Sequence, residues 1–188
     1  APLMSALDRF SPGVMYAAMD FANLPTGAQR RLLENGVILS GLFGLLRPDD
    51  LIPNYQLGME ASLPDVGPVA DYWRPIISPM LNESLEDRWV WDLLPEVHRN
   101  AWTDEHTYTA RVEVQFERVE DGERVPITGE DLEVQRGQFV NFIVQETAEE
   151  MEDLREWSEE ESDELTFDED ASTYDEDTKT WEIVMVQD

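Results

Sequence analysis

Residues 37–55 read V-I-L-S-G-L-F-G-L-L-R-P-D-D-L-I-P-N-Y, and the interpretation of the whole chain starts from this stretch. It begins as an unbroken apolar run that contains two glycines, Gly41 and Gly44. A short apolar run bounded by turn residues is typical of a strand buried on both faces. Glycines inside such a run indicate where another backbone or a ligand comes close. We therefore expect a buried strand at residues 37–42 of an α/β protein.

The apolar run leads into a loop that is rich in proline and charge. Pro48 and Pro53 each fix their own φ and restrict the residue before them, so they stiffen the loop. Arg47 and Asp50 are the leading functional candidates, because a guanidinium on a stiff loop offers a fork of donors that suits a phosphate or a carboxylate. The alternative is structural: an ion pair between the two side chains that pins the loop to the core.

Two tyrosines and a second arginine complete the candidate site. Tyr55 would supply a phenol edge or a stacking face, and Tyr16 would face the same cavity. Arg136 lies beside Gly137 at the start of an expected helix over residues 131–146, where it can approach a phosphate. Its alternative role is to neutralise the acidic side chains near it, namely Glu130, Asp131 and Glu133.

The composition is strongly acidic. The 188 residues include 42 acidic and 13 basic residues, for a formal net charge of −29, and no cysteine. Residues 1–100 hold 13 acidic and 7 basic residues, whereas residues 101–188 hold 29 and 6. Self-repulsion of this size should be relieved by salt. The composition favours adaptation to a salty cytoplasm, and the competing interpretation is an acidic interaction surface such as a DNA mimic.

The sequence lacks the motifs that are typical of several classes of protein function. Without cysteine there is no thiolate metal site or thiol nucleophile. The only histidines, His98 and His106, do not have the spacing of a zinc motif, and we expect no metal site. No phosphate-binding loop, dinucleotide glycine pattern or serine elbow occurs, so we expect no cofactor, and the sequence leans away from an enzyme. No window is long enough to cross a bilayer, and the N-terminal residues lack a secretory signal, so we expect a cytoplasmic protein that does not bind membranes.

The remaining pattern predicts a mixed α/β (α+β) fold. Strands are expected at residues 88–93, 108–119 and 181–186, and Asp121-Gly122 should form a hairpin turn. A helix over residues 69–83 should be interrupted at Pro75 and Pro79. The acid-rich segment at residues 147–177 should be an ordered, solvated surface anchored by Leu154, Trp157, Leu165, Phe167 and Tyr174. We therefore predict a single domain over residues 1–188, with a central mixed sheet, surrounding helices and a hairpin.

Residues 40–55 resemble the S-G-L-Y-G-L-L-R-P-x-D-x-I-x-P-Y stretch of the YaaA peroxide-stress family, with Phe43 in place of the tyrosine. Further segments resemble the family in the same order along nearly the whole chain. They are S-P-G-V-M-Y at residues 11–16, Tyr72-Trp73 followed by Ile76, Ile77, Leu81 and Asn82, the pair Arg136-Gly137, and the closing strand at residues 181–186.

The resemblance implies a YaaA-like α/β fold and a cytoplasmic role in the response to hydrogen peroxide. It also implies contact with DNA through an arginine-containing cleft, with Arg47 and Arg136 as the cationic contacts. Two alternatives stay open. One is an enzyme that acts on a nucleotide or nucleobase in a pocket around Arg47, Asp50, Tyr55 and Tyr16. The other is an acidic interaction protein with a degenerate site.

The chain also departs from the family pattern. The family's opening segment, with its S-P-A-K-T-like sequence, is not found, which suggests a fragment, a processed product or a shortened member. The lysines that precede the family's R-G pair are replaced by Glu133 and Gln135. Because DNA affinity comes largely from phosphate neutralisation and falls with salt, these changes argue against broad electrostatic binding. A local arginine site remains compatible with them.

Overall fold

A five-stranded mixed sheet forms the centre of the molecule. The computed structural model describes residues 2–147, 150–160 and 165–187, without the side chains of residues 157–160. The strand order is β10-β11-β8-β7, and β9 pairs with β8 outside this path. The β7–β8 and β8–β11 pairs are parallel, whereas β10–β11 and β8–β9 are antiparallel. The strands are β7 (Trp89–Asp92), β8 (Ala110–Glu120), β9 (Glu123–Pro126), β10 (Leu165–Asp175) and β11 (Thr180–Gln187). The predicted mixed sheet is confirmed.

The alternation along β8 sets the two faces of this sheet. Val112 and Phe116 are buried in the main hydrophobic core, while Arg111 and Glu113 point to the opposite, polar face. The turn into β9 lies at Asp121 and Gly122, which both have positive φ, as a two-residue hairpin turn requires. The predicted hairpin is therefore confirmed.

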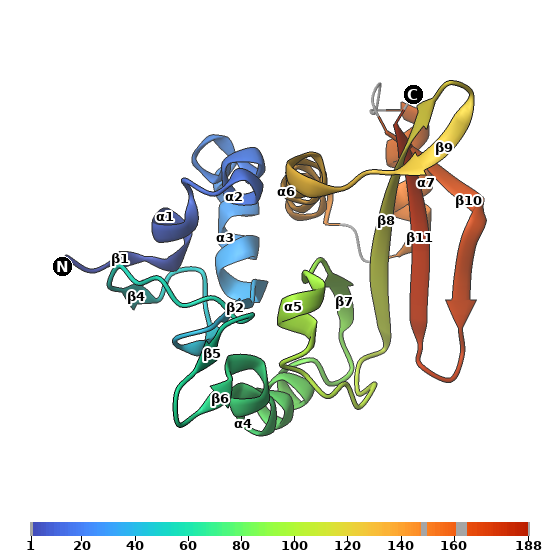
Figure 1. Cartoon of the computed structure of the whole chain (residues 1–188). Coiled ribbons are helices and arrows are strands. Elements are labelled where there is room, and N and C mark those ends of the chain that lie inside the picture. The colour runs from blue at the N-terminus through green and yellow to red at the C-terminus, as the bar shows by residue number, and fades with distance from the viewer. Residues whose placement is uncertain (1, 148–149, 161–164, 188) are drawn as a thin grey trace.

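Helix α6 (Gly129–Glu146) lies between the sheet and the N-terminal helices (Figure 1). Phe139 and Phe142 pack into the core under the sheet, and Val144 packs into a second cluster with α2 and α3. Where α6 meets α2 (Val14–Met19), a methyl group on Gly137 would clash with the Met15 carbonyl oxygen. Glycine is thus required for this close approach of two backbones.

The N-terminal half is built from short elements around smaller apolar clusters. They are β1 (Met4–Ser5), α1 (Ala6–Phe10), α2, the 3₁₀ turn η1 (Phe21–Asn23), α3 (Thr26–Asn35), β2 (Ile38–Ser40), β3 (Gly44–Leu46), β4 (Leu51–Ile52), β5 (Ser62–Leu63) and β6 (Gly67–Pro68). The strands form three two-stranded sheets, β1-β4, β2-β3 and β5-β6. Within the described residues, no helix has the length and apolar character needed to span a membrane.

The structure corrects the prediction of a strand buried on both faces at residues 37–42. Only Ile38–Ser40 is a strand, and it pairs with β3 in a separate hairpin rather than in the central sheet. Val37 and Leu42 are exposed. The glycines explain the difference, because Gly44 has a φ of +76° and the chain reverses after three strand residues.

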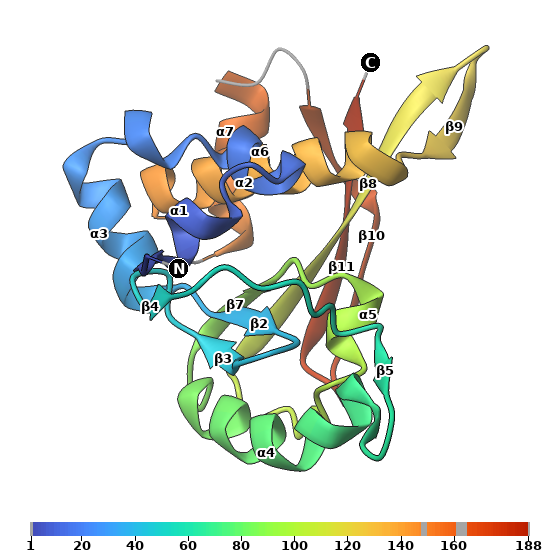
Figure 2. The ribbon, with the colours of Figure 1, turned by 60° about the vertical axis from the view of Figure 1, so that its left-hand side comes forward.

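The prediction for the proline-containing helix is also corrected. Helix α4 (Val69–Ser84) runs through Pro75 and Pro79 without interruption. Its inward row is well packed, because Val69, Ile77 and Leu81 are buried. Packing of this row offsets the hydrogen bonds that the two prolines remove. The β2–β3 hairpin lies over this helix (Figure 2).

The remaining elements complete the sheet side of the molecule. Helix α5 (Glu96–Arg99) is a single short turn, and α7 (Met151–Glu160) precedes β10. Leu154 and Leu165 are buried, as predicted, whereas Tyr174 is exposed. The predicted anchor Trp157 lies outside the described side chains.

Candidate functional site

The turn that carries Arg47 and Asp50 is held by its backbone. The Asp50 carboxylate accepts a hydrogen bond of 2.7 Å from the Arg47 backbone N–H, not from the guanidinium. The carbonyl oxygens of Pro48 and Asp50 accept hydrogen bonds from the backbone N–H groups of Leu7 and Ala6 in α1. Asp50 therefore shapes a turn that is fastened to α1, and it does not orient the Arg47 guanidinium.

The Arg47 side chain points to solvent. It is 66% exposed, and its Nε lies 3.6 Å from the carboxylate of Asp49, which is 54% exposed. An exposed pair at this distance contributes little to stability, so it leaves the Arg47 guanidinium available to a ligand.

Tyr16 and Tyr55 meet in a cluster that we call the tyrosine cluster, formed by Phe10, Tyr16, Ser40, Phe43 and Tyr55. The ring of Phe10 lies 5.5 Å from Tyr16 and 6.2 Å from Tyr55, and Phe43 lies 5.4 Å from Tyr55. The structure thus brings together the two predicted tyrosines from segments 39 positions apart in the sequence.

Ser40 supplies the polar centre of the tyrosine cluster. Its Oγ lies 2.6 Å from the Tyr55 hydroxyl and also accepts the backbone N–H groups of Leu42 and Phe43. Burial raises the pKa of Tyr16 to about 12, with a smaller contribution from Tyr55 beside it. Among the described residues, no hydrogen bond contacts the Tyr16 hydroxyl. The cluster therefore holds two phenols, and the hydroxyl of Tyr16 is the one without a hydrogen bond among the described residues.

The glycines of the motif make room for this arrangement. A methyl group on Gly41 would overlap the Leu57 carbonyl oxygen, and one on Gly44 would lie 2.7 Å from the ring of Trp73. The Trp73 indole N–H donates to the Gly41 carbonyl oxygen at 2.7 Å. The expectation of close backbone approach is confirmed at Gly41, whereas the close neighbour at Gly44 is the side chain of Trp73.

Arg136 lies on α6, away from the turn with Arg47, and borders a different set of groups. Burial lowers the pKa of Arg136, and the nearby Arg99 lowers it further, while Asp92 and Glu133 oppose this shift. Among the described residues, no hydrogen bond or ion pair contacts its guanidinium. The alternative of neutralisation by Glu133 is therefore not realised as a direct contact.

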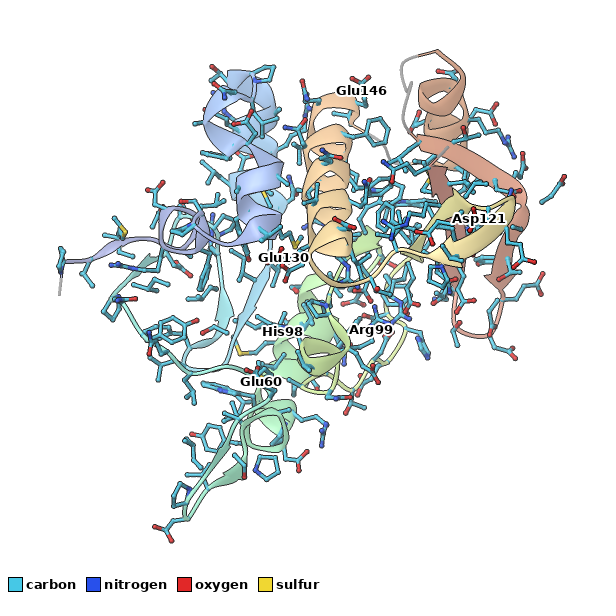
Figure 3. All side chains as sticks on the ribbon, turned by 45° about the horizontal axis from the view of Figure 1, so that its top comes forward. Glu60, His98, Arg99, Asp121, Glu130 and Glu146 are labelled. Carbon is cyan, nitrogen blue, oxygen red and sulfur yellow. The ribbon has the colours of Figure 1, made fainter. Side chains whose placement is uncertain are left out.

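The groups next to Arg136 belong to what we call the charge network: Asp92, Arg99, Asp104, Arg111 and Glu113. Arg99 lies 3.3 Å from Asp92 and 3.2 Å from Glu113. Arg111 contacts Glu113, and it lies 2.6 Å from Asp104 and 3.7 Å from Asp92. In Figure 3, Arg99 lies on the side of α5 nearer the sheet and His98 on the side nearer Glu60.

The centre of the charge network is buried. The Asp92 side chain is only 2% exposed, and its Oδ1 accepts the backbone N–H of Leu94 at 3.0 Å. Tyr108 donates to Asp104 at 2.6 Å, and burial is the main reason why the pKa of Tyr108 is raised. Asp92 Oδ2 and the Nε atoms of Arg99 and Arg111 have no hydrogen-bond partner among the described residues, so the centre depends on the ion pairs between these side chains.

Most arginines in the described part of the chain contact an oxygen atom of another residue. Carboxylates contact those at positions 47, 74, 99, 111, 118, 124 and 155, and carbonyl or amide oxygens contact those at 9, 31 and 88. Within these residues, only Arg30 and Arg136 lack both kinds of contact. Arg30 is exposed, so Arg136 is the half-buried arginine whose donors are free.

Two cavities lie elsewhere. One of about 300 Å³ is on the polar face of the sheet, beside the charge network, and is lined by His106, Arg111, Thr180 and Glu182 among others. The other, of about 330 Å³, lies between α4 and α5. None of the five predicted site residues lines either cavity.

Sequence reasoning missed the charge network and the role of Ser40. The only available signal for the charge network was the polar row on β8, where Arg111 and Glu113 alternate with apolar residues. The signal for Ser40 was its place at the end of an apolar strand, just before the first glycine. Neither signal identifies the partners, because they come from distant segments.

Comparison with known proteins finds several UPF0246 proteins that are similar to this chain. A UPF0246 protein of Streptomyces coelicolor is 35% identical over 99 residues, which cover 53% of this chain and 38% of that protein. UPF0246 proteins of Rickettsia bellii and Flavobacterium johnsoniae are 26% identical over 149 residues and 28% over 147 residues. These two alignments cover 78% and 76% of this chain and 60% and 58% of the relatives. The chain thus spans less than two thirds of the length of these relatives.

The sequence model of the family described as "Peroxide stress protein YaaA" matches residues 1–171. The match includes all five predicted site residues and every element from β1 to the start of β10. The chain therefore belongs to the YaaA peroxide stress protein family.

Proposed function

We propose that this chain acts in the cytoplasm in the response to hydrogen peroxide, and that it contacts DNA at a few phosphates through Arg136 and Arg47. The family name supports the stress role. The observation that carries the DNA contact is the free guanidinium of Arg136 in a chain whose other described arginines are nearly all engaged.

The position of Arg136 favours an anionic ligand. Its burial and the nearby Arg99 both disfavour the charged guanidinium, and an incoming phosphate would relieve both effects. Arg47 adds a second donor on a turn whose backbone is fixed by Asp50. Guanidinium groups are well suited to phosphate oxygens, because they donate two parallel hydrogen bonds.

We expect the protein to contact a few DNA phosphates rather than a long stretch of DNA. With a net charge of −29, the chain as a whole repels DNA, so binding depends on these few local donors. Each phosphate contact contributes about 0.9 to the slope of log affinity against log salt, so two contacts predict a slope near −2.

The test is a titration of a fluorescent DNA duplex across salt concentrations with wild type, Arg136→Ala and Arg47→Ala. Arg155→Ala is the matched control, because Arg155 is already engaged by Glu152 and Glu169. We expect each of the first two variants to weaken binding at least fivefold and to reduce the salt slope by about 1. The control should bind like wild type.

Two results would contradict the DNA proposal. One is the absence of wild-type binding at low salt in a preparation that circular dichroism shows to be folded. The other is an equal loss of affinity in all three variants. In cells exposed to peroxide, the Arg136→Ala variant should also protect less well than the Arg155→Ala variant.

A second candidate function is a nucleotide- or nucleobase-acting enzyme with a pocket around Arg47, Asp50, Tyr55 and Tyr16. The observation in its favour is the unbonded hydroxyl of Tyr16 within a group of aromatic rings that could stack on a base. This candidate predicts that a nucleotide raises the melting temperature of wild type but not of Tyr16→Phe or Arg47→Ala. A panel of nucleotides without any thermal effect would count against it.

We also propose that the acidic composition is an adaptation to concentrated salt. The excess of acidic over basic residues is 23 in residues 101–188 and only 6 in residues 1–100. Screening should therefore raise the melting temperature as potassium chloride increases toward about 1 M, where the Debye length is about 3 Å. A melting temperature that does not change with salt would rule this out.

A further inference from the structure

The outward side of α4 carries an exposed apolar row, which we call the α4 ridge: Tyr72, Ile76 and Met80. Their exposed fractions are 52%, 42% and 57%. Residues four positions apart lie on one side of a helix, so the three form one continuous ridge. The inward row, which includes Val69, Ile77 and Leu81, is buried, so α4 has apolar residues on two sides.

The α4 ridge is held rigidly. The Trp73 ring contacts Tyr72 edge-on at 5.3 Å, and the Trp73 indole is fixed by its hydrogen bond to the Gly41 carbonyl oxygen. A fixed apolar surface of this kind marks an interaction site more often than isolated exposed side chains do.

We propose that the α4 ridge is the contact surface for a second copy of this chain. The spacing is self-complementary, because Tyr72 and Met80 lie four residues on either side of Ile76. About a two-fold axis at Ile76, Tyr72 of one copy would pack against Met80 of the other. Rows of residues four apart interdigitate in the most common class of helix packing, with a crossing angle near −50°.

The charge distribution also favours a second copy at this place. Two chains with a net charge of −29 repel each other over most of their surfaces. Helix α4 carries only three charged side chains, Asp71, Arg74 and Glu83, and Asp71 and Arg74 pair with each other at 2.7 Å. The α4 ridge thus lies on a helix with a formal net charge of −1, where two acidic chains repel each other less than over the rest of their surfaces.

The size of the α4 ridge predicts a weak dimer. Partly exposed side chains of this kind offer on the order of a few hundred Å² per copy, below the roughly 800 Å² per partner of a stable interface. We therefore expect a dissociation constant on the order of 0.1–1 mM. Association should strengthen with salt, because salt screens the repulsion between the copies and favours apolar burial.

The first test is sedimentation equilibrium of the 188-residue chain over a range of protein and salt concentrations. Ile76→Glu should raise the dimer dissociation constant at least tenfold, since it places two carboxylates at the two-fold axis. Val119→Glu is the matched control, because Val119 is 44% exposed on the distant β8–β9 hairpin. Both variants should keep the wild-type melting temperature to within a few degrees.

The second test uses the absence of cysteine from the chain. In Ile76→Cys the introduced thiols of two copies would meet at the axis, so oxidation should give a disulfide-linked dimer faster than in Val119→Cys. A wild-type chain that stays monomeric at about 1 mM in high salt, where the predicted constant requires substantial dimer, would overturn the proposal. Equal crosslinking rates for the two cysteine variants would overturn it as well, and would mean that something other than a second copy covers the α4 ridge.

Discussion

The tyrosine cluster and the charge network both bury polar groups between segments that are distant in the sequence, but they satisfy them differently. In the tyrosine cluster the groups are neutral, and Ser40 bonds the Tyr55 hydroxyl and two backbone N–H groups. In the charge network full charges surround Asp92, whose side chain is 2% exposed. Leaving a buried charge without its partner costs more free energy than leaving a buried neutral hydroxyl without one. The two regions should therefore respond very differently to mutation and pH.

The largest effect should come from removing the central carboxylate of the charge network. Asp92→Ala takes away the group that Arg99 and Arg111 share, and it leaves two guanidinium groups partly buried with fewer acceptors. We expect a loss of about 3–5 kcal/mol in the free energy of unfolding, measured by urea denaturation.

The control for this prediction is Asp71→Ala. Asp71 also pairs with an arginine, at 2.7 Å, but its side chain is 57% exposed. The loss there should stay below about 1 kcal/mol. Similar losses in the two variants would show that burial does not distinguish the charge network from a surface ion pair.

The next effect concerns the β2–β3 hairpin, which supplies Ser40 and Phe43 to the tyrosine cluster. Gly44→Ala combines a φ of +76° with a contact of 2.7 Å to the Trp73 ring, and should cost about 3 kcal/mol. Gly122→Ala has a similar φ of +82° but open space around it, and should cost about 1 kcal/mol. Thermal denaturation of both variants measures the two losses of stability, and their difference is the contribution of the contact with Trp73. Equal losses would show that this contact contributes nothing.

The glycines show how much of the fold the sequence could predict. Gly41 and Gly44 interrupt an apolar run, which correctly predicted a close backbone contact at Gly41 but not the Trp73 side chain that contacts Gly44. The same run also suggested a strand buried on both faces over residues 37–42, and this was wrong, because the pattern does not reveal that the chain turns back at Gly44. The long alternation of β8 and the Asp121-Gly122 turn were predictable, since they depend on local residues alone.

The candidate site was less predictable for a physical reason. Tyr16 and Tyr55 were expected to face one cavity, and the structure places them in one aromatic cluster. Arg47 and Arg136 were named together, but they lie on different elements and border different groups. The charge network joins Asp92, Asp104 and Glu113 through two arginines, and such pairings depend on tertiary contacts that a single sequence does not display.

A smaller effect should appear in the pH dependence of stability, and it comes from Tyr16 of the tyrosine cluster. Burial raises the pKa of Tyr16 to about 12, above the ordinary value of 10 that applies in the unfolded chain. The neutral phenol thus stabilises the fold fully below pH 10, and this stabilisation is lost as the pH rises through 12. Wild type should lose about 1–2 kcal/mol more than Tyr16→Phe between pH 10 and pH 12.

The measurement is urea denaturation at a series of alkaline pH values. Tyr72→Phe, which changes an exposed tyrosine, is the control and should follow wild type. Part of the decline will remain in Tyr16→Phe, because the pKa of Tyr108, which donates a hydrogen bond to Asp104 of the charge network, is raised as well. If Tyr16→Phe and wild type lose stability in parallel, the Tyr16 hydroxyl is not buried in the way the cluster requires.

The smallest effect on stability should come from Arg136, although it borders the charge network. Arg136→Met should change the free energy of unfolding by no more than about 0.5 kcal/mol, because it removes a guanidinium that no described carboxylate contacts. Arg99→Met should cost at least about 2 kcal/mol, because Asp92 and Glu113 would lose a partner. An arginine whose removal leaves stability unchanged but weakens DNA binding would be present for its ligand rather than for the fold. If Arg136→Met instead destabilises as much as Arg99→Met, Arg136 belongs to the charge network, and its free donors no longer argue for a phosphate contact.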